Sequence, residues 1–74
     1  MRKFRAIAES AQLSLDILNA AKSLDDLRAI RSNRLKKLKG DRAGQFSIRV
    51  NDQYRICFRW IENEPHEVEL VDYH

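Results

Sequence analysis

The spacing of apolar residues changes once along the chain, from a helical period to a strict alternation. In the first third, apolar residues recur at intervals of three and four, which places them on one stripe of a helix. The stripe consists of Phe4, Ile7, Ala11, Leu15 and Leu18, widened by Leu13, Ile17 and Ala21. Because this stretch contains neither glycine nor proline, the pattern predicts a helix from about Lys3 to Ala21 that packs on a core.

A second, short helix is indicated by its capping residues. Ser23 is a favoured N-cap residue, and Asp25 and Asp26 would follow it in the first turn, where carboxylates complement the helix dipole. We expect one to two turns of helix, with Leu24 and Leu27 facing inward. Residues 31–44 are polar and basic and contain two glycines, so we expect an ordered loop, in which Leu35 and Leu38 could anchor a helical turn.

From residue 45 onward the apolar residues alternate with polar ones, which is typical of half-buried strands. Phe46, Ile48 and Val50 form the first apolar row, and Tyr54, Ile56, Phe58 and Trp60 form the second. The two rows share one face of a sheet only if Val50 lies opposite Tyr54. This register predicts a three-residue loop over residues 51–53, with a bulge.

A third strand is expected from Glu67 to Tyr73, after a turn over residues 61–66. In this strand Val68 and Leu70 would face the core. The predicted fold is therefore α+β, with a long and a short helix packed on a three-stranded antiparallel meander. At 74 residues the whole chain, residues 1–74, is expected to form a single domain with a thin core.

Composition excludes several classes of protein. Cys57 is the only cysteine, so an intrachain disulfide and a cysteine-based metal site are excluded. The two histidines lack the spacing of metal ligands, and no segment approaches the roughly 20 apolar residues of a membrane span. No apolar signal-peptide core follows the basic residues at the start. These features indicate a soluble protein of the cytoplasm, with no membrane partner.

Charge is strongly segregated along the chain. Residues 28–60 carry ten basic and two acidic side chains, whereas residues 61–74 carry five acidic side chains and no lysine or arginine. Segregation of this kind is typical of a segment that faces a polyanion. The alternative is a solvated basic face that the acidic tail neutralises on folding.

The strand alternation also groups residues that could act on a phosphodiester. Arg49, Arg55 and Arg59 would line the open face of the sheet, with Lys39 at its rim, and the chain ends in Asp72, Tyr73 and His74. Cations stabilise the charge of a five-coordinate phosphorus transition state, and a base and an acid move the protons. In the simpler reading, the arginines are solvated or paired with acids, for which Glu67 and Glu69 are available, and the terminal histidine is frayed and idle.

From Leu24 onward the sequence resembles the HigB toxins, which are a branch of the RelE superfamily. The resemblance covers residues 20–74 and rests on the segments LKGDRAG (38–44), SIRVNDQYRICFRW (47–60) and VDYH (71–74). It implies a RelE-like microbial ribonuclease fold and the toxin of a type II toxin–antitoxin pair. The implied activity is ribosome-dependent cleavage of mRNA, with no metal or cofactor. The implied partners are mRNA, the ribosome and a HigA-like helix-turn-helix antitoxin.

The resemblance also implies roles for individual residues. Arg55 and Lys39 would stabilise charge on the phosphate, Asp72 and His74 would transfer protons, and Tyr73 would position the substrate. The expected RNA-binding residues are Lys36, Arg42, Arg49 and Arg59. Some family members carry a histidine where this chain has Lys36, so a proton-transfer role at that position does not carry over.

The start of the chain departs from the family, whose members usually carry a further strand before the long helix. An uncovered sheet edge leaves backbone donors and acceptors unpaired, so we expect a compensating contact, such as a dimer formed by strand pairing. Two alternatives to the nuclease remain. One is a toxin relative that binds an antitoxin, RNA or the ribosome without cutting, and the other is a general basic RNA-binding domain.

Overall fold

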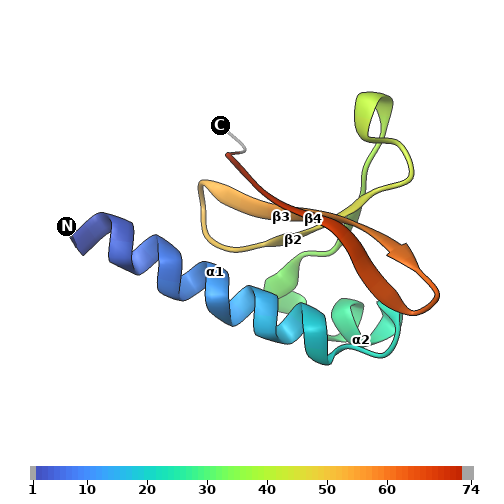
Figure 1. Cartoon of the computed structure of the whole chain (residues 1–74), viewed down its shortest axis with the longest axis horizontal. Coiled ribbons are helices and arrows are strands. Elements are labelled where there is room, and N and C mark those ends of the chain that lie inside the picture. The colour runs from blue at the N-terminus through green and yellow to red at the C-terminus, as the bar shows by residue number, and fades with distance from the viewer. Residues whose placement is uncertain (1, 73–74) are drawn as a thin grey trace.

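The computed structural model describes the backbone of residues 2–72 and the side chains of residues 8–72. A long helix lies along one face of a small antiparallel sheet (Figure 1). The helices are α1 (Arg2–Ala20) and α2 (Leu24–Ala29), followed by two short 3-10 turns, η1 (Arg31–Asn33) and η2 (Gly40–Arg42). The strands are β1 (Lys36–Lys37), β2 (Phe46–Arg49), β3 (Tyr54–Ile61) and β4 (Glu64–Asp72).

The sheet has four strands in the order β1-β2-β3-β4, so the prediction of three strands was wrong by one. The additional strand, β1, is only two residues long and pairs with the start of β2. Two adjacent lysines have no apolar alternation to reveal a strand. The backbone N–H of Leu38 donates to the carbonyl of Gln45 at 2.9 Å and extends this pairing. The α+β class itself is confirmed.

The register of the β2–β3 hairpin is the one that the alternation predicted. Ile48 lies opposite Ile56, and the N–H of Val50 donates to the carbonyl of Tyr54 at 3.0 Å. The side-chain oxygen of Asn51 closes the three-residue loop, accepting from the N–H groups of Gln53 and Tyr54 at 2.8 Å each. The N–H of Asn51 also donates to the Tyr54 carbonyl, at 3.3 Å, so two successive residues face one across the strands, as the expected bulge requires. A separate shift of register lies between β3 and β4, between Cys57 and Arg59.

The β3–β4 connection is tighter than the expected turn over residues 61–66. Ile61 pairs with Glu64, so only Glu62 and Asn63 form the turn. Both have positive φ angles, 52° and 65°, which is the geometry of a type I′ hairpin and matches the twist of the strands. Strand β4 therefore begins at Glu64 rather than at Glu67 and runs for nine residues along the edge of the sheet.

The two helices begin and end close to their predicted positions. The Ser23 hydroxyl accepts the N–H of Asp26 at 3.2 Å, and the Asp26 carboxylate accepts the N–H of Lys22 at 2.9 Å. These two bonds satisfy backbone donors that the start of α2 would otherwise leave unpaired. The predicted cap and the inward position of Leu27 are confirmed.

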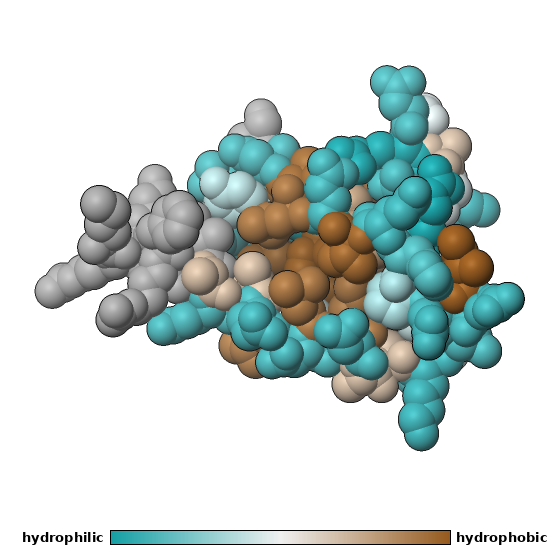
Figure 2. Space-filling view, in the orientation of Figure 1, coloured by the Kyte–Doolittle hydropathy of each residue, from teal (hydrophilic) through white to brown (hydrophobic). Residues whose placement is uncertain are grey.

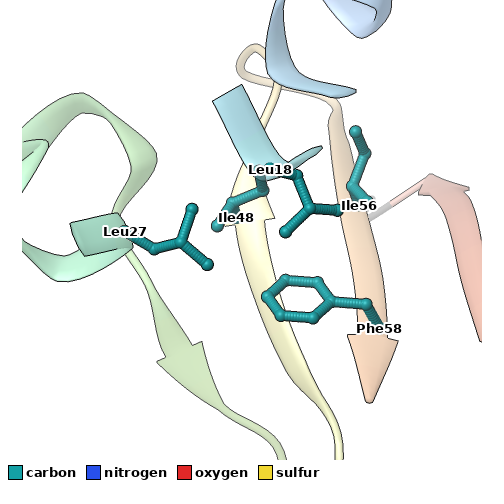
Figure 3. Close-up of a cluster of buried hydrophobic side chains, with 5 residues drawn as sticks. All are labelled: Leu18, Leu27, Ile48, Ile56 and Phe58. Carbon is teal, nitrogen blue, oxygen red and sulfur yellow. The ribbon is translucent and has the colours of Figure 1, made fainter. Parts of the chain in front are cut away.

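The core lies where α1 and α2 meet the centre of the sheet. Its buried side chains are Leu18, Leu27, Ile48, Ile56 and Phe58 (Figure 3). The phenyl ring of Phe58 lies 6.2 Å from that of Phe46, and 6.2 Å, edge to face, from the ring of Trp60. Phe4 and Ile7, predicted for the same stripe, have side chains outside the described part of the chain.

Three residues predicted to pack inward are substantially exposed. Leu13 is 64% exposed, because it lies about 140° around the helix from the buried Leu18. Val68 and Leu70 are 43% and 46% exposed, because they belong to the edge strand β4. On the face of the molecule seen in Figure 2, apolar residues gather in the middle, surrounded by polar ones. Within residues 2–72, no helix combines the length and apolar character that a membrane span requires.

Candidate nucleic-acid interface

A basic hollow of about 260 Å³ opens beside the β2–β3 hairpin, on the side where β1 joins the sheet. We call it the basic hollow, and its lining residues are Arg34, Lys36, Arg49, Asn51, Asp52 and Arg55. Four of these side chains are basic and one is acidic. The lining comes from the segment after η1, from β1, from the end of β2, from the hairpin loop and from β3. The fold thus concentrates cations from distant parts of the sequence in one concavity.

Arg55 forms the inner wall of the basic hollow and is only 7% exposed. Its Nε donates to the Ser47 hydroxyl at 2.8 Å, and its Nη2 donates to the backbone carbonyls of Arg34 at 2.5 Å and Ser47 at 3.3 Å. The prediction that Arg55 lies on an open face was therefore wrong, because the segment around Arg34 covers this part of the sheet. A guanidinium with several fixed donors keeps a constant orientation.

Arg49 and Lys36 stand nearer the mouth of the basic hollow. Arg49 forms an ion pair with Asp52 in the adjacent loop, and the Asp52 side chain is 97% exposed. An ion pair this exposed is worth little and is readily exchanged for another anion. Lys36 is exposed on β1. Of the predicted site residues, the fold brings Lys36, Arg49 and Arg55 together.

Arg34 was not singled out in the sequence, although it lines the basic hollow and its carbonyl accepts from Arg55. It follows η1 and adopts a left-handed conformation, with φ 44° and ψ 54°. Its N–H donates to the carbonyl of Arg31 at 3.1 Å, and the buried Asn33 side chain anchors the same turn by donating to the Leu27 carbonyl at 3.2 Å. A run of basic residues cannot reveal which member closes such a turn.

Asp72 lies at the same end of the sheet as the hairpin loop. It pairs with Tyr54 across the strands, and its Oδ2 accepts from the side-chain amide of Gln53 at 3.1 Å. Tyr73 and His74, expected to complete the catalytic group, lie outside the described residues. Lys39 is exposed at the start of η2 and does not line the basic hollow.

The remaining two predicted RNA-binding arginines belong to a second region, which we call the paired end. Arg42 donates to Glu69 at 3.0 Å and to the side chain of Gln45 at 3.1 Å. Arg59 donates to Glu67 at 2.5 Å. The pairing of a strand arginine with one of these glutamates is therefore confirmed for Arg59, and the structure adds the pair of Arg42 with Glu69.

Cys57 lies between the basic hollow and the paired end and is fully buried. Burial raises the pKa of its thiol; Arg42 opposes this effect, Glu69 adds to it, and Arg55 opposes it. A thiol of this kind is a weak nucleophile at neutral pH. Among the side chains that the structure describes, no three potential metal ligands come together.

The sequence over residues 3–74 matches the family model described as the RelE-like toxin of the type II toxin–antitoxin system HigB. The chain belongs to this HigB-like toxin family. The resemblance noted from the sequence is thereby confirmed, and the α+β fold is consistent with a RelE-like toxin.

The HigB-like chain is also similar in sequence to two curated proteins. It is 48% identical over 48 residues to Toxin HigB-1 of Vibrio cholerae, a match that covers 65% of this chain and 50% of the relative. It is 36% identical over 56 residues to an uncharacterised protein of Haemophilus influenzae, covering 76% of this chain and 55% of that protein. The chain therefore spans about half the length of the curated relatives it matches.

Proposed function

We propose that the protein is a toxin that cleaves mRNA on the ribosome and thereby inhibits translation and growth. The observation that carries this proposal is the basic hollow, where four segments supply four cations, near the end of β4 that pairs with the start of β3. A phosphodiester is the anion that fits such a site, since guanidinium groups bind phosphate oxygens through paired donors.

The proposed reaction is attack of a ribose 2′-OH on the adjacent phosphorus. The new P–O2′ bond gives a 2′,3′-cyclic phosphate, and the bond from phosphorus to the 5′-oxygen breaks. A base takes the 2′-OH proton and an acid protonates the departing 5′-oxygen, roles that we assign to Asp72 and His74. Tyr73 positions the substrate, and the mechanism calls for neither a metal nor a cofactor.

The cations have distinct roles in this proposal. Arg55 is the strongest candidate to stabilise the transition state, because its orientation is already fixed and it pays no reorganisation on reaction. Arg49, Lys36 and Arg34 bind the phosphates on either side of the reacting one. Lys39 contacts RNA further from the centre, whereas Arg42 and Arg59, predicted to bind RNA, contribute little while Glu69 and Glu67 engage them. The ribosome would supply the orientation of the substrate.

We further propose that a HigA-like helix-turn-helix antitoxin binds the toxin in the cytoplasm. A dimer through an exposed sheet edge stays a prediction, and charge works against it at the edge formed by β4. β4 carries Glu64, Glu67, Glu69 and Asp72, so pairing two copies would bring like charges together.

The test is mRNA cleavage in a reconstituted translation reaction, mapped by primer extension with and without ribosomes. The chain would be compared with its Arg55→Ala and His74→Ala variants and with Arg28→Ala, which removes an exposed arginine paired with Asp25 on α2. We expect cuts that need ribosomes, vanish in the first two variants and persist in Arg28→Ala. A folded protein that binds ribosomes but makes no cuts would establish the non-cleaving alternative instead.

A further inference from the structure

Ser47 is the most deeply enclosed polar side chain next to the basic hollow. It lies on β2 opposite Cys57, is fully buried, and does not itself line the hollow. Its hydroxyl oxygen accepts from Arg55 Nε at 2.8 Å. Arg55 is the diagonal neighbour of Ser47 across the two strands, a separation that a long side chain spans easily.

A second acceptor holds the other edge of the same guanidinium group. Arg55 Nη2 donates to the Arg34 carbonyl at 2.5 Å, and that carbonyl is set by the left-handed turn that follows η1. The planar group is therefore held at two of its three nitrogens by acceptors from different segments. Held this way, it can neither rotate about its last torsions nor withdraw from the hollow.

We propose that Ser47 is a positioning residue, whose hydroxyl fixes the guanidinium of Arg55 so that it meets a phosphodiester in one orientation. This inference rests on the proposed function, and it adds a residue that acts through Arg55 rather than on RNA. A preorganised cation stabilises a transition state better than one that must be ordered during the reaction. Loss of the hydroxyl should therefore lower kcat more than it raises KM.

The direct test is proton exchange at the Arg55 side chain in the ¹⁵N-labelled protein. In the unaltered chain, the Arg55 Nε–H signal should persist at neutral pH, while that of the exposed Arg31 is lost to exchange. Ser47→Ala should speed exchange at Arg55 at least tenfold, and Ser47→Thr, which keeps an acceptor, should restore protection. Ser14→Ala removes another buried serine, on α1, and should change nothing at Arg55.

A double-mutant cycle in cleavage separates positioning from general damage to the fold. Ser47→Ala should lower kcat about tenfold in the parent chain and have little further effect in an Arg55→Lys background, because lysine has no Nε–H donor. Equal losses in both backgrounds would overturn the proposal, as would an Arg55 Nε–H that exchanges as fast as that of Arg31 in the parent chain. A parent chain that does not cleave would contradict the proposed function alone, and the exchange data would then decide the role of Ser47.

Discussion

The basic hollow and the paired end contain the same residue type on adjoining strands, yet they differ in how their charge is balanced. In the basic hollow, four basic residues face one carboxylate, that of Asp52, which is almost fully exposed. At the paired end, Arg42 and Arg59 are each matched by a glutamate of β4. An anion entering the hollow gains attraction directly, whereas one approaching the paired end must displace a carboxylate. Arginine content alone therefore does not locate an RNA site.

The largest difference is expected for Arg55 and Arg59, which lie four residues apart on β3. Arg55→Lys should lower the cleavage rate by about 100-fold or more, since lysine keeps the charge but loses the fixed donors. Arg59→Lys should change the rate by less than about threefold, because Glu67 already engages that side chain. Single-turnover cleavage in the translation reaction measures both. Similar losses in the two variants would remove the distinction between the two regions.

A smaller effect is expected at the mouth of the basic hollow. Arg49→Ala should weaken binding to a single-stranded RNA about tenfold and reduce the slope of log affinity against log salt by about one, because one phosphate contact is lost. Fluorescence anisotropy over a range of salt concentrations gives both quantities. Arg42→Ala serves as the matched variant at the paired end, and an equally reduced slope there would speak against the hollow as the principal phosphate site.

The paired end should become an RNA-binding surface when its carboxylates are removed. Glu67→Gln should tighten RNA binding about threefold at low salt, because Arg59 would then be available to a phosphate. Glu62→Gln, in the β3–β4 turn, changes the net charge equally without altering that ion pair and should have a smaller effect. Equal gains in the two variants would mean that net charge, not the released arginine, sets the affinity.

The smallest expected effect concerns Cys57, whose thiol pKa is influenced by charges of both regions: Arg55 in the basic hollow, and Arg42 and Glu69 at the paired end. Burial raises the pKa of this thiol and also covers its sulfur, so alkylation of the folded protein by iodoacetamide should be slow at neutral pH and faster at alkaline pH. Glu69→Gln removes a contribution that raises the pKa and should shift the alkylation profile to lower pH.

The same shift has a consequence for stability. The thiol ionises more readily in the unfolded chain, so its contribution to stability is present at neutral pH and declines as the pH rises through the ordinary thiol pKa. Chemical denaturation over that range should show this decline, and Cys57→Ser should reduce it. A profile of stability against pH that is unchanged in Cys57→Ser would contradict this account.

The sequence predicted those features that depend on short-range pattern. The register of β2 with β3 followed from alternation alone, because a shift by one residue would have turned Ile48 away from the core. The cap at Ser23 followed from local hydrogen bonding. The family resemblance also rests on short segments, around Arg55 and at the end of the chain, and the match to the HigB-like family model confirms it.

Features that depend on distant segments were not predictable in this way. Strand β1 exists because Lys36 and Lys37 meet β2, and two lysines carry no pattern of their own. Arg55 is buried because the turn at Arg34 lies over it, which no alternation within β3 could indicate. Alternation placed the arginines on one face but could not tell which would find a glutamate of β4, since the bulge in the β3–β4 register decides that.

The most direct test of the basic hollow as the RNA site is a titration of the ¹⁵N-labelled protein with a non-cleavable DNA analogue of a short RNA, followed at the arginine Nε–H signals. We expect the signals of Arg49 and Arg55 to shift progressively, while those of Arg42 and Arg59 move little at moderate salt. Shifts at Arg42 and Arg59 as large as those at Arg49 and Arg55 would show that the paired end binds nucleic acid equally well, and would contradict the assignment of the RNA site to the basic hollow.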